Sequence, residues 1–198
     1  MSESLRILQL YPKADYFTGA AIQLRELAWG LHARGHEVVV GTRPSAVWAE
    51  QCAAAGIPHA AIPMRSEVDL ASAVALARLI RARHFDIIHC QKGKARTLAL
   101  LAGLFVKIPV LILNRGVSFP LDRWNRLGYT SPRVTAIVAV CESIKRGLVA
   151  AHVSADKIEV IYSGTDTDRS RCPDAPVQTS ARRRAIVLRS DSTSAFTM

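Results

Sequence analysis

Short apolar runs alternate with helix-length amphipathic segments from Leu5 to about Ile161, and this rhythm constrains the fold more than any other feature. The apolar runs predict strands at residues 5–11, 36–42, 59–63, 86–89, 109–114, 134–140 and 157–162. The segments between them predict helices at residues 19–35, 46–56, 69–84, 95–105 and 142–151, and a further segment at residues 121–129 separates the fifth and sixth strands. We therefore expect an α/β fold with a doubly wound, parallel, Rossmann-like sheet and right-handed crossovers.

The sequence of the first predicted helix indicates both its apolar face and the residue at which it ends. Its apolar residues recur at helical spacing and share one face: Ala21, Leu24, Leu27, Ala28 and Leu31. Gly35 follows at the position where a helix ends in a left-handed residue. The next run, "HEVVVGT", is continuously apolar, which is typical of a strand covered on both faces.

Composition narrows the class of protein. The chain has 198 residues, enough for one domain, and 49% of them are hydrophobic. No apolar run approaches the ~20 residues that cross a bilayer, and "MSESLRILQLYP" lacks the form of a secretory signal. We expect a cytoplasmic protein, with the inner membrane face as its other candidate location. The cysteines lie far apart, with no C-x-x-C pair, which favours reduced thiols and no metal site: Cys52, Cys90, Cys141 and Cys172.

The formal net charge of +10 raises the question of nucleic-acid binding. Residues 170–198 contribute five arginines and two aspartates, which leaves residues 1–169 at +7. No recognition motif accompanies this charge, and no basic stretch is interleaved with aromatic residues, so we expect no nucleic-acid partner. An anionic small molecule or an anionic membrane surface explains the charge equally well.

The rhythm stops at the C-terminal end of the chain. Residues 170–198 contain three consecutive arginines, many serines and threonines, and one apolar cluster, "AIVL". We interpret this segment as a basic Ser/Thr-rich tail of low order, separate from a domain at residues 1–169.

Candidate functional residues gather where predicted strands end. Ligands of such sheets bind beyond the carboxyl ends of the strands, and His89 ends the strand in "FDIIHCQKGKA". The imidazole ring of His89 titrates near neutral pH, so it could serve there as a base, an acid or a hydrogen-bond donor, although most histidines in proteins have no catalytic role. Gly19 opens a helix after the first strand, which suits a phosphate, but the G-x-G-x-x-G fingerprint is absent and a glycine at a helix start more often has a structural role.

Basic residues form a second set at the same predicted edge. Lys92, Lys94 and Arg96 lie in the turn after His89 and at the start of the next helix, and Arg115 ends the following strand. Cations at a helix start oppose the helix dipole by a few tenths of a kcal/mol each. They therefore indicate either a solvated surface or a site for an anionic group.

The combination of segments is more specific than any single motif. In order, these are "LRILQLYP…TGAAIQLRELAWGLHARGHEVVVGT", "FDIIHCQKGKA", "VTAIVAVCESIKRGLV" and "KIEVIYSGTDTDR". Together they resemble the N-terminal half of a family 4 glycosyltransferase with the GT-B fold, over roughly residues 5–169. The matching motifs are Gly19, Gly35-His36, Asp86 to His89, Cys141-Glu142-Ser143 and "VIYSGTD".

This resemblance implies a fold and an activity. GT-B enzymes have two facing Rossmann-like domains, of which residues 1–169 would be the acceptor-side domain. In the family the other domain holds most of the nucleotide-sugar donor, which is UDP- or GDP-linked, and transfer retains the anomeric configuration, in most members without a metal. By the same resemblance Gly19 lies near the donor phosphate and His89 is catalytic. No cofactor is implied besides the nucleotide-sugar co-substrate.

Three departures from the family pattern refine these expectations. Cys141 replaces the usual serine at a helix start, which predicts a weaker cap. Arg115 stands where many members have histidine, and this favours an acceptor with acidic groups. The acceptor-binding set is therefore Lys92, Lys94, Arg96 and Arg115. The abrupt change at Ser170, before any second domain, suggests a truncated or frame-shifted reading frame.

Several functions remain open at this stage. The first is a hexosyltransferase-type enzyme acting on a glycan or lipid-linked acceptor, in polysaccharide or lipopolysaccharide biosynthesis, with this chain inactive alone. The second is a non-catalytic acceptor- or nucleotide-binding module, or one half of an enzyme completed by a separate chain. The third is a Rossmann-like nucleotide-binding or epimerase protein.

Overall fold

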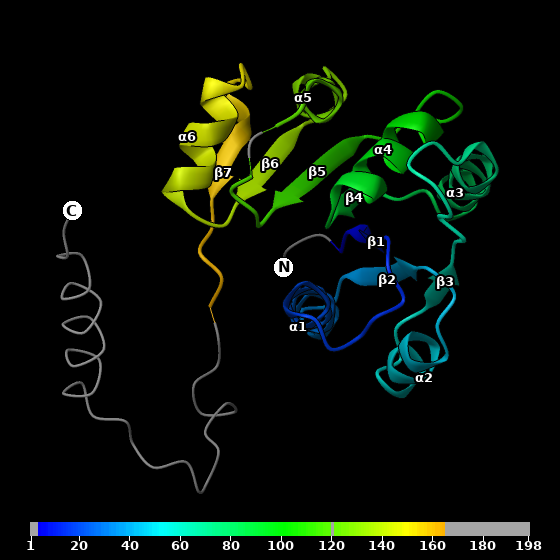
Figure 1. Cartoon of the computed structure of the whole chain (residues 1–198). Coiled ribbons are helices and arrows are strands. Elements are labelled where there is room, and N and C mark those ends of the chain that lie inside the picture. Colours follow the sequence, from blue (N-terminus) through cyan, green and yellow to red (C-terminus); the bar gives the residue numbers. More distant parts are fainter. Residues whose placement is uncertain (1–3, 120, 165–198) are drawn as a thin grey trace, which may run out of the picture. The chain divides into compact units, whose positions relative to one another are not determined.

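The computed structural model describes residues 4–119 and 121–164 (Figure 1). Its strands are β1 (Arg6–Tyr11), β2 (Glu37–Thr42), β3 (His59–Ala61), β4 (Ile87–Cys90), β5 (Val110–Arg115), β6 (Ala136–Ala139) and β7 (Ile158–Val160). Its helices are α1 (Gly19–Ala33), α2 (Ala46–Ala54), α3 (Leu70–Arg83), α4 (Gly93–Ala102), α5 (Arg123–Thr130) and α6 (Glu142–Ala150), with a 3-10 turn at Ala155–Lys157. The described residues up to Ser163 form one compact unit, and the predicted domain boundary at residue 169 and the predicted tail lie outside the described residues.

All seven strands pair in parallel in the order β3-β2-β1-β4-β5-β6-β7, which confirms the predicted doubly wound α/β sheet. The chain order reverses between β1 and β4. In open parallel sheets this switch point is where the connecting loops diverge and leave a ligand-binding crevice at the carboxyl edge. A ligand is therefore expected to bind at the edge formed by the carboxyl ends of β1, β4 and β5.

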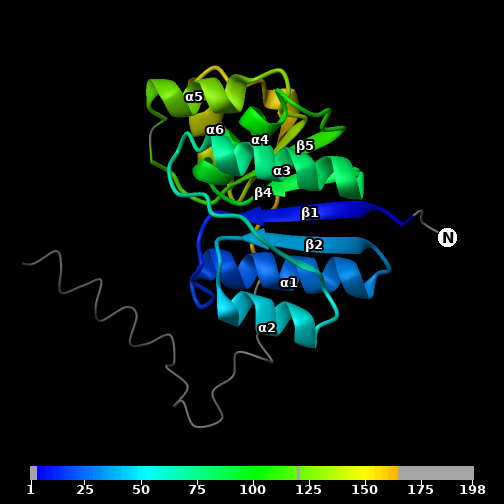
Figure 2. The ribbon, with the colours of Figure 1, turned by 90° about the vertical axis from the view of Figure 1, so that its right-hand side faces the viewer.

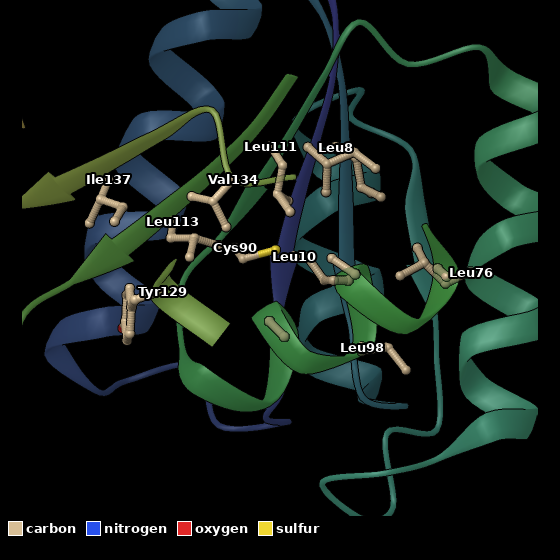
Figure 3. Packing of buried hydrophobic residues seen from close by; sticks show 14 of the residues in the cluster. Leu8, Leu10, Leu76, Cys90, Leu98, Leu111, Leu113, Tyr129, Val134 and Ile137 are labelled. Carbon is tan, nitrogen blue, oxygen red and sulfur yellow. The ribbon is translucent and has the colours of Figure 1, made fainter. Parts of the chain in front are cut away.

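Helices cover the two faces of the sheet unequally (Figure 2). One face of β1 and β2 packs against α1 and α2, around Leu24, Ala28, Val40 and Trp48. The other face packs against α3, α4, α5 and α6 along β1, β2 and β4–β7. Figure 3 shows how strand side chains such as Leu10 and Leu113 meet Leu76, Leu98 and Tyr129 from three of these helices.

The first helix follows its predicted signals with one exception. Thr18 caps its start by accepting a hydrogen bond from the backbone of Ala21 at 3.4 Å, and Gly35 takes a φ of 87° just beyond its end, as predicted. The prediction that Leu27 lies on the buried face was wrong, because its side chain is 37% exposed. At 100° per residue, Leu27 falls at the margin of the stripe centred on Leu24 and Ala28.

Two other predicted motifs have local structural roles. Asp86 lies at the amino end of β4, where its carboxylate accepts hydrogen bonds from the backbone N–H of Arg6 at 2.8 Å and from the Arg6 guanidinium. These bonds hold the pKa of Asp86 below its usual value. Cys141 caps α6 without any side-chain capping hydrogen bond, as its substitution for serine predicted.

None of the helices within residues 4–119 and 121–164 is long and apolar enough to span a membrane.

The two faces of β5 predict different sensitivities to truncation. Leu113 is 1% exposed on the helix-covered face, whereas the neighbouring Ile112 faces the opposite side and is half-buried. Leu113→Ala should lower the free energy of unfolding by about 2–5 kcal/mol, and Ile112→Ala by clearly less. Urea unfolding of both variants measures the difference. Equal losses would contradict the packing described above.

Candidate functional site

The carboxyl edge at the switch point carries a set of buried amides. Parallel pairing places Gln91, just after β4, beside Asn114 near the end of β5. The Asn114 amide donates to Gln91 Oε1 at 2.7 Å and to Gln23 Oε1 of α1 at 3.4 Å. Gln23 in turn donates to the hydroxyl of Ser163 at 2.6 Å. The second turn of α1 therefore reaches the carboxyl end of β5.

His89 lies next to this amide set, two residues before Gln91 and on the same side of the strand. Its ring is 8% exposed and shares a sheet face with Gln9, its register partner on β1. Burial lowers the pKa of His89 to about 4, so the imidazole is neutral at physiological pH. A neutral imidazole at this edge can donate one hydrogen bond and accept another, but it supplies no positive charge.

Several polar atoms at the edge lack hydrogen-bond partners in the described structure. They are Gln9 Oε1, His89 Nε2, Gln91 Nε2 and Asn114 Oδ1, and all are buried. Buried polar groups are normally satisfied, so four unsatisfied atoms on neighbouring strands are an unusual concentration. Donors and acceptors of this mixed kind match the hydroxyl groups of a carbohydrate or a small set of bound waters.

Gly19 begins α1 one turn before Gln23, on the same side of the helix. It is exposed, and a Cβ built on it meets no atom within 4 Å. Neither backbone conformation nor crowding within the described structure therefore requires glycine at this position. The open space at the start of a 15-residue helix fits the predicted approach of an anionic group.

The predicted basic set does not form one continuous rim. Lys92 caps α4 without a side-chain capping bond and extends toward β1, with Nζ 5.6 Å from the centre of the Tyr11 ring. Desolvation and the nearby Lys13 lower its pKa. Lys94 is half-buried on the first turn of α4.

Arg96 is buried, so the solvated-surface interpretation is wrong for this residue. It is 4% exposed, lies 4.7 Å from the centre of the Tyr129 ring, and donates to Asn125 Oδ1 at 2.8 Å. The Nε and Nη1 groups are buried, and no described residue forms a hydrogen bond with them. The guanidinium passes directly over Gly128, where an added Cβ would lie 2.4 Å from Nε. Arg96 therefore joins α4 to α5.

Arg115 approaches the same aromatic ring from the end of β5. Its guanidinium carbon is 5.3 Å from the centre of the Tyr129 ring, and the side chain donates to the carbonyl of Phe119. Arg115 remains half-buried, unlike Arg96. The structure thus places the four predicted cations in two groups: Lys92 and Lys94 beside the start of α4, and Arg96 and Arg115 around Tyr129.

Sequence reasoning missed the amides that surround His89. Gln9 and Asn114 were visible as isolated polar residues within the apolar runs "RILQLY" and "VLILNR". Their relation to His89 depends on which strands pair and in which register, and the sequence alone does not show this. Among the described residues, no group of three His, Cys, Asp or Glu side chains is placed to hold a metal ion.

Comparison with known proteins gives a consistent family signal. The family model for Glycosyltransferase Family 4 matches residues 17–169. None of the curated proteins matches the chain.

Solved structures of glycosyltransferases share the fold. A glycosyltransferase from Rickettsia africae ESF-5 has a TM-score of 0.73 at 21% identity, with 96% of this chain and 50% of that chain covered. Anabaena Alr3699/HepE in complex with UDP and glucose has a TM-score of 0.69 at 18% identity, covering 93% and 50%. The lipopolysaccharide outer core galactosyltransferase WaaB has a TM-score of 0.61 at 16% identity, covering 82% and 46%. The chain thus spans about half the length of these proteins, and at these identities the likeness concerns the fold.

The buried neutral His89 predicts a pH dependence of stability. In the unfolded chain a histidine takes up a proton near pH 6.5, whereas folded His89 does so only near pH 4. Protonation therefore favours the unfolded chain, and this component of stability is lost as the pH falls from about 6.5 to about 4. His89→Gln should remove that component. Urea unfolding at about pH 7 and about pH 4.5 tests this, and an unchanged pH dependence in the variant would refute it.

Gly128 predicts a reversal of the usual effect of glycine in a helix. Replacing an exposed helical glycine by alanine normally adds up to ~1 kcal/mol of stability. Here Gly128→Ala should instead destabilise the fold by about 1–3 kcal/mol, because the new methyl group displaces the Arg96 guanidinium from Asn125 and Tyr129. In the background of Arg96→Ala the same change should cost much less, as urea unfolding of the double-mutant cycle would show. Additive losses would contradict the proposed clash.

Proposed function

The chain belongs to glycosyltransferase family 4, and on that premise we propose that it is the acceptor-side half of an enzyme that transfers a sugar from a nucleotide-sugar to a glycan or lipid-linked acceptor. The single observation that carries this proposal is the convergence of His89, its unsatisfied amide neighbours and the open start of α1 on one edge of the sheet.

The edge offers distinct groups for the two substrates. In this proposal the helix start at Gly19 receives the donor phosphate, because the backbone N–H groups of the first turn and the helix dipole favour an anion there. His89 lies beside the reacting sugar. Since its imidazole is neutral, its role is to exchange hydrogen bonds with sugar hydroxyls rather than to neutralise charge.

The cations are assigned to the acceptor. Lys92, Lys94 and Arg115 retain exposed surface and suit an acceptor with acidic groups. Arg96 acts indirectly, because α5 covers its guanidinium. Its role is to position Tyr129, whose ring Arg115 also contacts. The finer chemistry is also part of the proposal: a hexosyl donor linked to UDP or GDP, and retention of anomeric configuration. The UDP and glucose bound to Anabaena Alr3699/HepE support a UDP-linked donor.

A second candidate is a binding module or one half of a split enzyme. The observation that favours it is that the chain spans only about half the length of the solved glycosyltransferases it matches. In a split enzyme a separate chain would supply the donor-binding half. A second half should restore turnover to the enzyme half, whether it is joined or supplied as a separate chain, but not to a binding module.

Activity should therefore depend on supplying that second half. Bringing two substrates together in the reactive geometry can account for about 7–11 kcal/mol of a reaction barrier. Half of a site cannot provide this, so we expect the 198-residue chain alone to show no sugar transfer and only weak binding of nucleotide-sugars. Joined to the C-terminal half of a similar family 4 enzyme, it should gain turnover, measured by release of the free nucleotide.

Two results would decide against the proposal. Robust transfer by the chain alone would show that the second half is not needed. A folded fusion that binds the donor but shows no turnover with any acceptor would favour the binding module.

A further inference from the structure

Two cavities of the described structure lie at the amino edge of the sheet, opposite the candidate site. One has a volume of about 400 Å³ and lies at the start of β2, between the ends of α1 and α3. The other has a volume of about 220 Å³ and lies between the end of α4 and the starts of β5 and β6. The charges around them differ, and this difference decides which kind of ligand each can hold.

The charged groups around the larger cavity oppose one another. Arg83 and Glu37 both line it and carry opposite charges. The helices α1 and α3 end beside it, and each helix C-terminus adds a partial negative charge of about half a unit. The remaining polar lining comes from His32 and His36, so this cavity favours no particular class of ligand.

The smaller cavity has an apolar interior. Ala99 of α4 and Leu111 of β5 line it and are buried, and Leu100 and Ile108 line it and are half-buried. The short side chain of Ala99 leaves space between the helix and the strand. Because an apolar cavity of about 150 Å³ is large enough to bind benzene, the volume here admits one six-membered ring with a small substituent.

Backbone hydrogen bonds fix the floor of this cavity. The N–H of Leu111 donates to Thr135 Oγ1 at 3.1 Å, and its carbonyl accepts from the N–H of Thr135 at 2.9 Å. Figure 3 shows Leu111 beside Val134, whose N–H donates to the carbonyl of Ser131 at 3.1 Å and closes the turn that carries Arg133. The walls are therefore fixed before a ligand binds, which lowers the entropic cost of binding.

Two cations lie where this cavity opens to solvent. Lys107 and Arg133 line it and are exposed, and neither forms an ion pair within the described part of the chain. The Arg133 guanidinium lies over the end of α4, since a Cβ added to Gly103 would be 3.1 Å from its Nη1. The helix end contributes about half a negative charge against two full positive ones. No acidic side chain of the described residues lines the cavity, so its opening is positive.

From this arrangement we infer that the cavity between α4 and β5, called the α4–β5 cavity below, binds a small aromatic carboxylate. The ring lies against Ala99 and Leu111, and the carboxylate lies between Lys107 and Arg133. A neutral apolar molecule would leave both cations without a partner. A carboxylate or phosphate without a ring would leave the apolar interior empty. Only a ligand with both parts matches the whole lining.

The α4–β5 cavity lies outside the candidate site. Leu111 precedes Asn114 by three residues, which is ~10 Å along a strand, and the two side chains lie on opposite faces of the sheet. The inference does not depend on sugar transfer, because binding to this cavity needs no donor, acceptor or second half. It can therefore be measured with the 198-residue chain alone.

Titration of the full chain with benzoate, followed by NMR of its methyl groups, tests the inference. The methyl signals of Leu100, Ile108 and Leu111 should shift together and saturate, with a Kd on the order of 1 mM for a ligand of this size. Acetate, which lacks the ring, should produce no saturable shift. Lys107→Gln with Arg133→Gln should weaken benzoate binding roughly 5- to 30-fold, the factor that two partly exposed charge contacts represent. The same pair should leave the weaker binding of benzyl alcohol unchanged, because that ligand carries no charge.

Two further variants complete the experiment. Ala99→Leu fills the interior and should abolish binding of both benzoate and benzyl alcohol. Arg43→Gln with Arg78→Gln removes the same charge at exposed sites outside the cavity and should leave binding unchanged. Circular dichroism confirms that each variant is folded, and if Ala99→Leu is not, the pair Lys107→Gln with Arg133→Gln still decides.

Three results would overturn the inference. The first is the absence of a saturable shift with benzoate at these methyl groups. The second is a control pair that weakens benzoate binding as much as the change at Lys107 and Arg133 does. The third is an equal loss of benzyl alcohol binding in the variant of Lys107 and Arg133, which would show that the two cations do not contact the carboxylate.

Discussion

The parallel pairing of β1 with β4 is the constraint on which the rest of the structure depends. At its amino end the pair is held by Asp86, whose carboxylate accepts the backbone N–H of Arg6. A shift of one residue would turn every side chain of the strand to the opposite face. With the register fixed, Gln9 and His89 share a face at the carboxyl end, and the crossovers on either side diverge there. One pairing thus sets both the core and the candidate site.

The site combines burial with unsatisfied polar groups, and that combination has a free-energy cost. A buried polar atom without a partner costs about 1–3 kcal/mol. Gln9, His89, Gln91 and Asn114 each leave one such atom at the edge. Hydrogen bonds to a ligand or to ordered waters would remove this cost, and this is why the polar set is a candidate binding surface. The neutral imidazole of His89 suits the same kind of ligand, because hydroxyl groups are recognised by hydrogen bonds rather than by charge.

Much of this fold could be predicted from the sequence because strand and helix periodicities are local. The run "DIIH" predicted β4 and placed His89 near its carboxyl end, one residue before the last residue of the strand, Cys90, and Gly35 predicted the end of α1. The burial of Arg96 could not be predicted in this way, because it depends on α5 packing across Gly128. A basic residue on the first turn of a helix looks the same in sequence whether solvent or another helix covers it. The cluster of amides around His89 could not be predicted for a similar reason, because its members come from strands and a helix that are far apart in the sequence: β1, β5 and α1.

The central claim is that the edge around His89 takes part in sugar transfer once the second half is present. Its most direct test is the turnover number of the completed enzyme with His89→Ala, compared with His84→Ala, which changes an exposed histidine just before the same strand. The account predicts that the His89 variant loses most of its turnover while the His84 variant keeps it. Equal turnover in the two variants, with both folded, would contradict the claim and return His89 to a structural role.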